Sequence, residues 1–211
     1  IDIREGIRVP LEPVQFDYQA AALGRFHVTD TDRFFANDDA WAPTVETTGR
    51  GTEGQRITSP ARYSYAVLPG ESEERFLLLR YFKPATEGRG IAFSAWLTAE
   101  SDPERFGRLR LLRFDAAEDA LDSVDTFVNS VARDADLSAQ IGLRRDQVLR
   151  GNTIVVPIGE GLLYVQPLYL DTASDSLPTL WQVVVSLGDG QIYAGATFLD
   201  ALESALRGQG P

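Results

Sequence analysis

Acidic residues are densest, outside an amphipathic helix face, in the segment DTDRFFANDD. It holds Asp30, Asp32, Asp38 and Asp39, and carboxylate oxygens are the ligands that Ca²⁺ prefers in proteins. The segment lacks the Asp-x-Asp-x-Asp-Gly spacing and the distal Glu of a calcium-binding loop. Asp and Asn also occur in caps and turns for purely local reasons. Two interpretations therefore stay open: the four carboxylates are calcium candidates, or they serve local turns.

His27 is the only histidine of the chain, and there is no cysteine. A Ser-His-acid triad would have to use His27, with Asp30 as the nearby acid, but no Gly-x-Ser-x-Gly elbow accompanies it. A single imidazole with no thiolate provides too few of the ligands that zinc and redox metals prefer. We therefore expect His27 to be a structural residue at a helix end, and we predict no catalytic residue and no cofactor.

The segment GRGTEG at residues 49–54 matches the Gly-x-Gly-x-x-Gly pattern of dinucleotide-binding proteins. That pattern binds phosphate only where a strand precedes it and a helix follows, because the N–H groups of the helix meet the pyrophosphate. The following residues, QRITSPARY, do not favour a helix, and Glu53 would place a negative charge at the phosphate. Residues 46–60 are polar, rich in glycine and aperiodic, which predicts a flexible loop.

The charge balance argues against polyanionic partners. A net charge of −11 and an isoelectric point near 4.6 disfavour nucleic acid and anionic lipid. The densest basic group is expected to form the solvated face of one strand: Arg108, Arg110 and Arg113. Aromatic residues at core spacing are expected to pack in the core rather than line a groove: Trp41, Trp96, Trp181, Tyr164 and Tyr169.

The periodicity of apolar residues predicts an α+β fold. Helical spacing covers residues 10–27, 115–132 and 137–147, and Thr197 is placed to cap a closing helix. Alternation with a period of two predicts strands, which include residues 62–69, 75–82, 91–99 and 107–114. We expect a single soluble domain over residues 1–211, with a mainly antiparallel sheet of about eight strands and helices packed on it.

The segment GEGLLYVQPLYLDT places Pro167 inside an apolar run. Residues 159–161 are predicted to form a turn, and Leu162 to Leu170 the returning strand of a hairpin. Proline cannot donate a ladder hydrogen bond, so Pro167 should mark a bulge or the point where pairing changes. We predict that the strand bends at Gln166 and Pro167 and that the side chains before this point are mostly buried.

Three separated motifs resemble uncharacterised protein family 0182, a group of large bacterial integral membrane proteins. The first is FDYQAAALGRFHVTDTDRFFANDDAW, and the second is ERFLLLRYFKP followed by AFSAWLTAESDPERFGRLRLLRF. The third is LRGNTIVVPIGEGLLYVQPLYL, followed by LPTLWQVVVSLGD and TFLDAL. Two departures from the family pattern are visible: Gln166 stands where the family usually has Glu, and a Gly-Pro is missing around FDAAEDALDSVDTF.

The resemblance implies a fragment, which a chain beginning at Ile1 without any methionine also suggests. Family members look like several transmembrane helices followed by a long soluble region outside the cytoplasm, and this chain matches the later part of that region. The resemblance implies no established activity, catalytic residue or cofactor for this chain. It implies localisation at the cell membrane, with the protein's own transmembrane region as a partner.

The leading expectation is a non-enzymatic extracytoplasmic module that binds a protein or another envelope component. The alternative is an envelope-located hydrolase-like or calcium-dependent activity that uses the acidic cluster of residues 30–39. A third possibility is a structural platform that orients the transmembrane part. The chain itself shows no run of about 18 apolar residues and no signal-peptide pattern.

Overall fold

The computed structural model describes residues 13–37, 39–51, 53–68, 70–85, 93–114, 122–158, 161–171 and 177–208. The chain divides into two compact units. Unit 1 comprises Ile1–Thr44 and Thr58–Ser123, and unit 2 comprises Val45–Ile57 and Val124–Pro211. This division does not test the expectation of a single domain, which stays a prediction.

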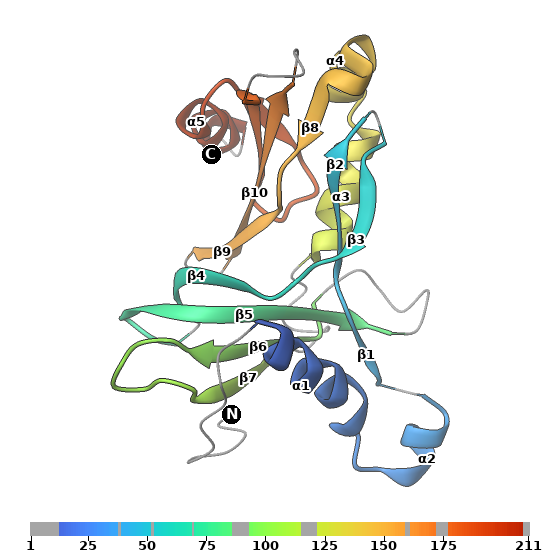
Figure 1. The fold of residues 1–211 in the computed structure, drawn as a ribbon, viewed down its shortest axis with the longest axis vertical. Helices are drawn as coiled ribbons and strands as arrows, with labels where there is room; N and C mark the ends of the chain where they lie inside the picture. The colour runs from blue at the N-terminus through green and yellow to red at the C-terminus, as the bar shows by residue number, and fades with distance from the viewer. Residues whose placement is uncertain are drawn as a thin grey trace. The chain divides into compact units, whose positions relative to one another are not determined.

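Unit 1 contains a five-stranded sheet among its described residues, with helices α1 (Pro13–Phe26) and α2 (Thr31–Phe35) (Figure 1). Its order is β1-β5-β6-β7, and β4 pairs with β5 beside β1; every pairing is antiparallel. The strands are β1 (Trp41–Pro43), β4 (Arg62–Val67), β5 (Glu74–Pro84), β6 (Ala95–Glu100) and β7 (Leu109–Arg113). The long strand β5 therefore holds the sheet together, because three other strands pair with it.

The two faces of β5 are covered differently, because successive side chains of a strand point to opposite faces. Leu78 and Phe82 pack in one cluster with Phe16 and Ala20 of α1. The other face carries a separate apolar cluster of Ala66, Leu68, Leu77 and Leu79. The continuous apolar run of β5 is thus explained by burial on both faces.

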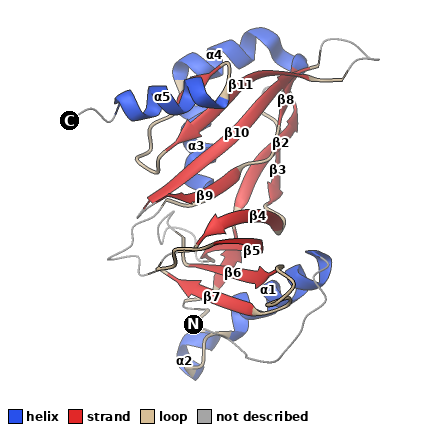
Figure 2. Cartoon of the chain, turned by 90° about the vertical axis from the view of Figure 1, so that its left-hand side faces the viewer, coloured by secondary structure: helices blue, strands red, loops and turns tan. Residues whose placement is uncertain are grey.

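Unit 2 contains a seven-stranded sheet among its described residues, in the order β12-β11-β10-β8-β2-β3, with β9 beside β10 (Figure 2). The strands are β2 (Val45–Arg50), β3 (Gln55–Thr58), β8 (Val148–Arg150), β9 (Ile154–Ile158), β10 (Gly161–Leu170), β11 (Thr179–Ser186) and β12 (Tyr193–Gly195). The helical elements are α3 (Val124–Arg133), α4 (Ala135–Arg144), the 3₁₀ turn η1 (Arg145–Gln147) and α5 (Phe198–Gly208).

Helix α5 packs on this sheet through its small residues. Ala201 and Ala205 are fully buried and form one cluster with Leu163, Val183 and Val185 of the strands. The predicted cap is confirmed, because the hydroxyl of Thr197 accepts the N–H of Asp200 at 3.2 Å. The α+β class with mainly antiparallel sheets is also confirmed, with twelve strands in two sheets over the described residues instead of about eight.

The prediction of a flexible loop over residues 46–60 is wrong. The segment instead forms most of β2 and all of β3, joined by a glycine-rich turn. Gly49, Gly51 and Gly54 all have positive φ, which favours glycine and reverses the chain within a few residues. The side chains of β3 lie at or near the surface, so this strand lacks the apolar alternation that sequence reasoning depends on. Strand β3, not a helix, follows the glycine pattern.

Strand β10 changes its neighbour at Pro167, as predicted. On one side it pairs with β9 through residues 161–165 and with β8 through residues 168–170. The Pro167 carbonyl accepts the N–H of Gly151 at 2.9 Å on this side. The backbone nitrogen and the carbonyl group of a strand residue point to the same side of the strand. The Pro167 nitrogen, which carries no hydrogen, therefore faces the gap between β9 and β8.

The remaining predictions for β10 have different outcomes. The side chains before Pro167 are mostly buried, since Leu162, Leu163 and Tyr164 are at most 4% exposed. The pairing with β11 continues past the proline, and its register shift falls later, between Leu168 and Tyr169. A bend at the proline itself stays a prediction.

Gln166 joins three segments of unit 2 from the middle of β10. Its side chain is 1% exposed. The amide Nε2 donates to the carbonyl oxygens of Thr47 at 2.8 Å and Gly151 at 3.0 Å, and lies 3.4 Å from Oγ1 of Thr153. Buried carbonyl groups that lose such a donor destabilise the fold. The position therefore requires a donor in this chain.

We expect Gln166→Glu to lower the free energy of unfolding by about 1–3 kcal/mol at neutral pH, because an ionised carboxylate cannot donate to the two carbonyls. The loss should shrink at acidic pH, where the protonated acid can donate one hydrogen bond. Urea unfolding at both pH values measures the difference. The exposed Gln191→Glu is the matched control, and equal stability of the two variants at neutral pH would contradict this role of Gln166.

Candidate functional site

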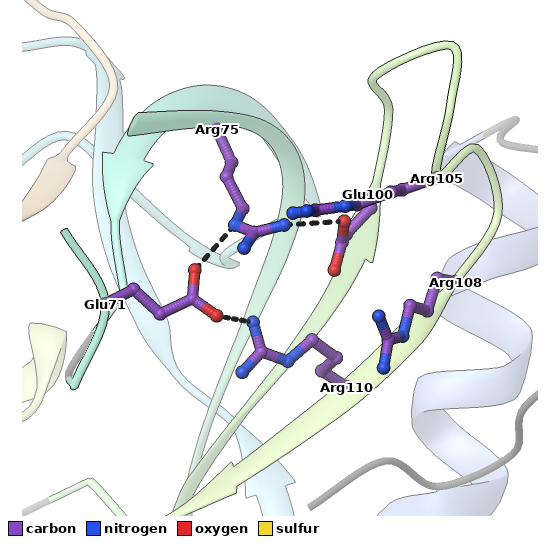
Figure 3. A pocket seen from close by; sticks show the side chains of 6 residues that line it. All are labelled: Glu71, Arg75, Glu100, Arg105, Arg108 and Arg110. Carbon is purple, nitrogen blue, oxygen red and sulfur yellow. Dashed lines mark hydrogen bonds and ion pairs between the residues drawn. The ribbon is translucent and has the colours of Figure 1, made fainter. Parts of the chain in front are cut away.

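A hollow of about 200 Å³ in unit 1 is lined only by charged side chains (Figure 3). The residues are Glu71, Arg75, Glu100, Arg105, Arg108 and Arg110. They come from strands β5, β6 and β7 and from the turns that join β4 to β5 and β6 to β7. Residues far apart in the sequence thus converge on one point of the sheet.

The strand register explains why three of these side chains share a face. Glu100 lies opposite Leu77, and Arg110 lies opposite Thr98 on the next strand. Arg75 is two residues before Leu77, so it points to the same face. This is the face opposite helix α1, and the polar side chains extend the apolar cluster around Leu77 and Leu79.

Ion pairs link two carboxylates and two guanidinium groups of the lining. Glu71 accepts hydrogen bonds from Arg75 Nε at 2.5 Å and from Arg110. Glu100 is completely buried, and its Oε2 accepts from Arg75 Nη1 at 3.1 Å. Within the described part of the chain, the other oxygen of Glu100 has no hydrogen-bond partner. Arg75 therefore sits between two carboxylates and is held in one orientation.

The pKa values of two residues report on this network. Burial alone would raise the pKa of Glu71, but hydrogen bonds from Arg110 and Arg75 outweigh burial and hold that pKa below its usual value. Burial would lower the pKa of Arg75, but its bonds to Glu100 and Glu71 raise it. Glu71 and Arg75 thus stabilise each other's charged forms.

The hollow keeps an excess of positive charge. Four guanidinium groups and two carboxylates leave a formal charge of +2 in the lining, within a chain whose net charge is −11. Guanidinium groups recognise carboxylate and phosphate oxygens through parallel hydrogen bonds. They do not exchange protons at ordinary pH. The arrangement is therefore suited to holding an oxyanion rather than to acid–base catalysis.

Two of the predicted calcium candidates, Asp30 and Asp39, make other contacts. Asp30 caps α2 by accepting the N–H of Arg33 at 2.9 Å, and Asp39 lies 3.2 Å from the Arg33 guanidinium. Asp32 is exposed in α2, while Asp38 lies outside the described residues. The described residues contain no group of three or more His, Cys, Asp or Glu side chains that could hold a metal ion. The calcium site stays a prediction.

His27 directly follows α1 and packs on Trp41. The two rings are stacked with centroids 3.4 Å apart. The Nδ1 atom lies 2.9 Å from the carbonyl oxygen of Leu23, which can only accept, so this nitrogen carries the proton. Burial lowers the pKa of His27, although that hydrogen bond and the charge of Asp39 oppose the effect. Each of these contacts suits a packing role.

Sequence reasoning noticed part of the hollow but interpreted it differently. Arg108 and Arg110 were expected on a solvated strand face together with Arg113. Instead, Arg108 and Arg110 line the hollow, whereas Arg113 lies over the Trp41 ring at 5.3 Å, on the opposite face of β7. Side chains of a strand alternate between its two faces, so residues 108 and 110 share one face and residue 113 lies on the other. This periodicity could have separated Arg113 from Arg108 and Arg110. No local signal indicated that Glu71 and Glu100 would meet them.

Comparisons with known proteins identify the family. Residues 1–144 match the profile of the Uncharacterised protein family (UPF0182). The chain belongs to this family. Among its UPF0182 relatives, a protein of Prochlorococcus marinus (strain MIT 9313) is 36% identical over 187 residues, which cover 86% of this chain and 18% of that protein. No solved structure gives a significant match.

Two further UPF0182 proteins show the same partial coverage. The protein of Trichodesmium erythraeum (strain IMS101) is 35% identical over 84% of this chain and 17% of its own length. The protein of Desulforamulus reducens is 32% identical over 87% of this chain and 19% of its own length. The chain thus spans about a fifth of the length of these relatives. None of the described helices is long and apolar enough to cross a membrane.

We expect Glu71→Gln to lower the free energy of unfolding by about 1–3 kcal/mol at neutral pH, because two charge-assisted hydrogen bonds weaken. The pKa of Glu71 is lowered in the folded chain, so its stabilisation is complete above the pKa of the unfolded chain. It disappears as the pH falls through the folded-state value. Urea unfolding across the acidic range should show the two proteins converging. The exposed Glu73→Gln serves as control; a Glu71→Gln difference that persisted unchanged in acid would contradict the ion-pair assignment.

Proposed function

We propose that this chain is an oxyanion-binding module, exposed on the extracytoplasmic side of a longer integral membrane protein. The observation that carries the binding role is the convergence of four guanidinium groups on one hollow of unit 1. Membership of UPF0182, the share of the relatives' length that the chain spans and the motif resemblance support the membrane setting. The partners would be the protein's own transmembrane region and an anionic group of an envelope component.

The residue types in the hollow favour binding over catalysis. Its lining contains only Arg and Glu, so it offers neither a histidine base nor a hydroxyl nucleophile. The Glu71 carboxylate is held in its ionised form by Arg75 and Arg110. A preformed set of guanidinium groups can receive an oxyanion with little rearrangement, which reduces the entropy cost of binding.

The charge of the surroundings makes the hollow selective. Negative charge elsewhere on the chain repels extended polyanions such as nucleic acid, whereas a small oxyanion can enter the local positive field. The volume of about 200 Å³ also fits a single phosphate or carboxylate group better than a large ligand. We therefore assign the binding role to one oxyanion group.

Titration with inorganic phosphate tests the binding role. At constant ionic strength, phosphate should raise the melting temperature of the chain by a few degrees more than chloride does, because it binds only the folded form. The double variant Arg105→Gln/Arg108→Gln should lose this difference. The exposed Arg133→Gln, which removes a charge in unit 2, is the control. A double variant that responds to phosphate like the parent chain would overturn the assignment.

Labelling of an introduced cysteine tests the location. The chain has no cysteine, and Leu143 is 84% exposed. In the full-length protein, Leu143→Cys should react with a membrane-impermeant maleimide on intact cells as completely as on permeabilised cells. The parent protein measured in parallel accounts for any cysteine elsewhere. Labelling that requires permeabilisation would place the module in the cytoplasm and refute its extracytoplasmic position.

A further inference from the structure

A second hollow lies entirely within unit 2 and has a volume of about 450 Å³. Helices α3 and α4 line it from one side, and strands β2, β3, β8 and β10 with the β2–β3 turn line it from the other. This volume falls in the range of small-molecule sites, about 300–1,000 Å³. It differs from the arginine hollow of unit 1 in size and in the chemistry of its lining.

The helical side of this hollow carries three buried apolar side chains, beside the polar Asn129 and Ser138. Val128 and Val131 are three residues apart in α3 and so share one face of the helix, and Ile141 comes from α4. All three side chains are at most 7% exposed. Together they offer an apolar strip that suits the aliphatic part of a ligand, since burial of apolar surface is favourable.

The strand side is polar and includes a buried cation. Arg150 is 8% exposed and Gln166 is 1% exposed, and both line the hollow. The β2–β3 turn presses on the stem of Arg150: a Cβ at Gly54 would lie 3.0 Å from Arg150 Cδ and 2.7 Å from Thr47 Cγ2. Glycine with positive φ at position 54 therefore permits this close packing, which restricts the guanidinium.

The electrostatics of the buried cation favour an anionic ligand. Burial lowers the pKa of Arg150, because desolvation disfavours its charged form. A negative group in such surroundings is attracted more strongly than it would be in water. The side chain of the other arginine of the lining, Arg56, is 57% exposed, so water screens its charge more strongly. We therefore assign the more buried Arg150 as the partner of the ligand.

We propose that this hollow binds a small amphipathic monocarboxylate, whose aliphatic body lies on α3 and α4 and whose carboxylate meets Arg150. The exposed carboxyl group of Glu53 on the rim opposes a second negative charge, which favours a monoanion. At about 30 Å³ for each water-sized group, the hollow accommodates roughly fifteen such groups. A medium-chain acid such as octanoate fits within that limit.

Three probes separate the two halves of the proposed ligand. Octanoate should bind with a dissociation constant at least tenfold lower than acetate, which lacks the aliphatic body, and than octan-1-ol, which lacks the charge. Isothermal titration calorimetry on the full 211-residue chain measures all three. Octanol binding as tightly as octanoate would overturn the role of Arg150, and acetate binding as tightly would overturn the role of the apolar strip.

Two alanine-to-tryptophan variants locate the site. Ala132 is exposed and lines the hollow, whereas Ala139 is exposed on α4 outside it. Ala132→Trp should weaken octanoate binding at least tenfold by obstructing the entrance, and Ala139→Trp should leave it unchanged. Thermal melting without ligand checks that both variants are folded. Equal octanoate binding by Ala132→Trp and the parent chain would refute the location.

The rim carboxylate supplies a variant with the opposite expectation. Glu53→Gln should strengthen octanoate binding a few-fold, because a repulsive charge is removed, and an affinity that falls would contradict the proposed orientation. The unit 1 variant Arg105→Gln/Arg108→Gln should bind octanoate as tightly as the parent chain does. Weaker binding by this variant would indicate that octanoate occupies the arginine hollow of unit 1 and would refute this proposal while supporting the oxyanion role there.

Discussion

Strand β5 buries both of its faces, and this constraint organises unit 1. Leu77, Leu78 and Leu79 are successive residues, yet each is at most 2% exposed. A charged side chain on such a strand is stable only if it is paired or hydrogen-bonded. Arg80 satisfies this through Asp17 at 3.1 Å, and Arg75 satisfies it through Glu71 and Glu100. The arginine hollow is thus built on a pairing that the buried strand requires.

Both hollows are lined in part by arginine, but the side chains that surround the guanidinium groups differ. In unit 1, the guanidinium groups are numerous and lie close to carboxylates, which fixes their orientation and keeps the hollow polar. In unit 2, the buried Arg150 lies opposite the apolar strip of the helices, so charge and aliphatic surface line the same space. The first arrangement suits a compact oxyanion, and the second suits an amphipathic acid. These differences permit independent tests of the two roles.

Local patterns explain why much of the fold could be predicted. The apolar residues in 75–82 and 107–114 indicated strands because these segments bury apolar side chains in the sheet, and Thr197 indicated a helix start through capping chemistry. The β2–β3 segment could not be recognised in this way, because its outer strand exposes nearly all its side chains and loses the signal. The arginine hollow was missed for another reason: Glu71 and Arg110 are 39 residues apart, and only strand pairing brings them together.

The sequence by itself determined the class of the protein: α+β, acidic overall, without cysteine, and similar to UPF0182 in three separated motifs. It also indicated that Pro167 marks a change of pairing, because a missing N–H is a local property. Only the tertiary structure decided which charges meet. A strand's register selects the face and neighbours of every side chain, and that register depends on distant segments. For this reason the arginines of β7 point to opposite faces, and Gln166 links segments more than one hundred residues apart.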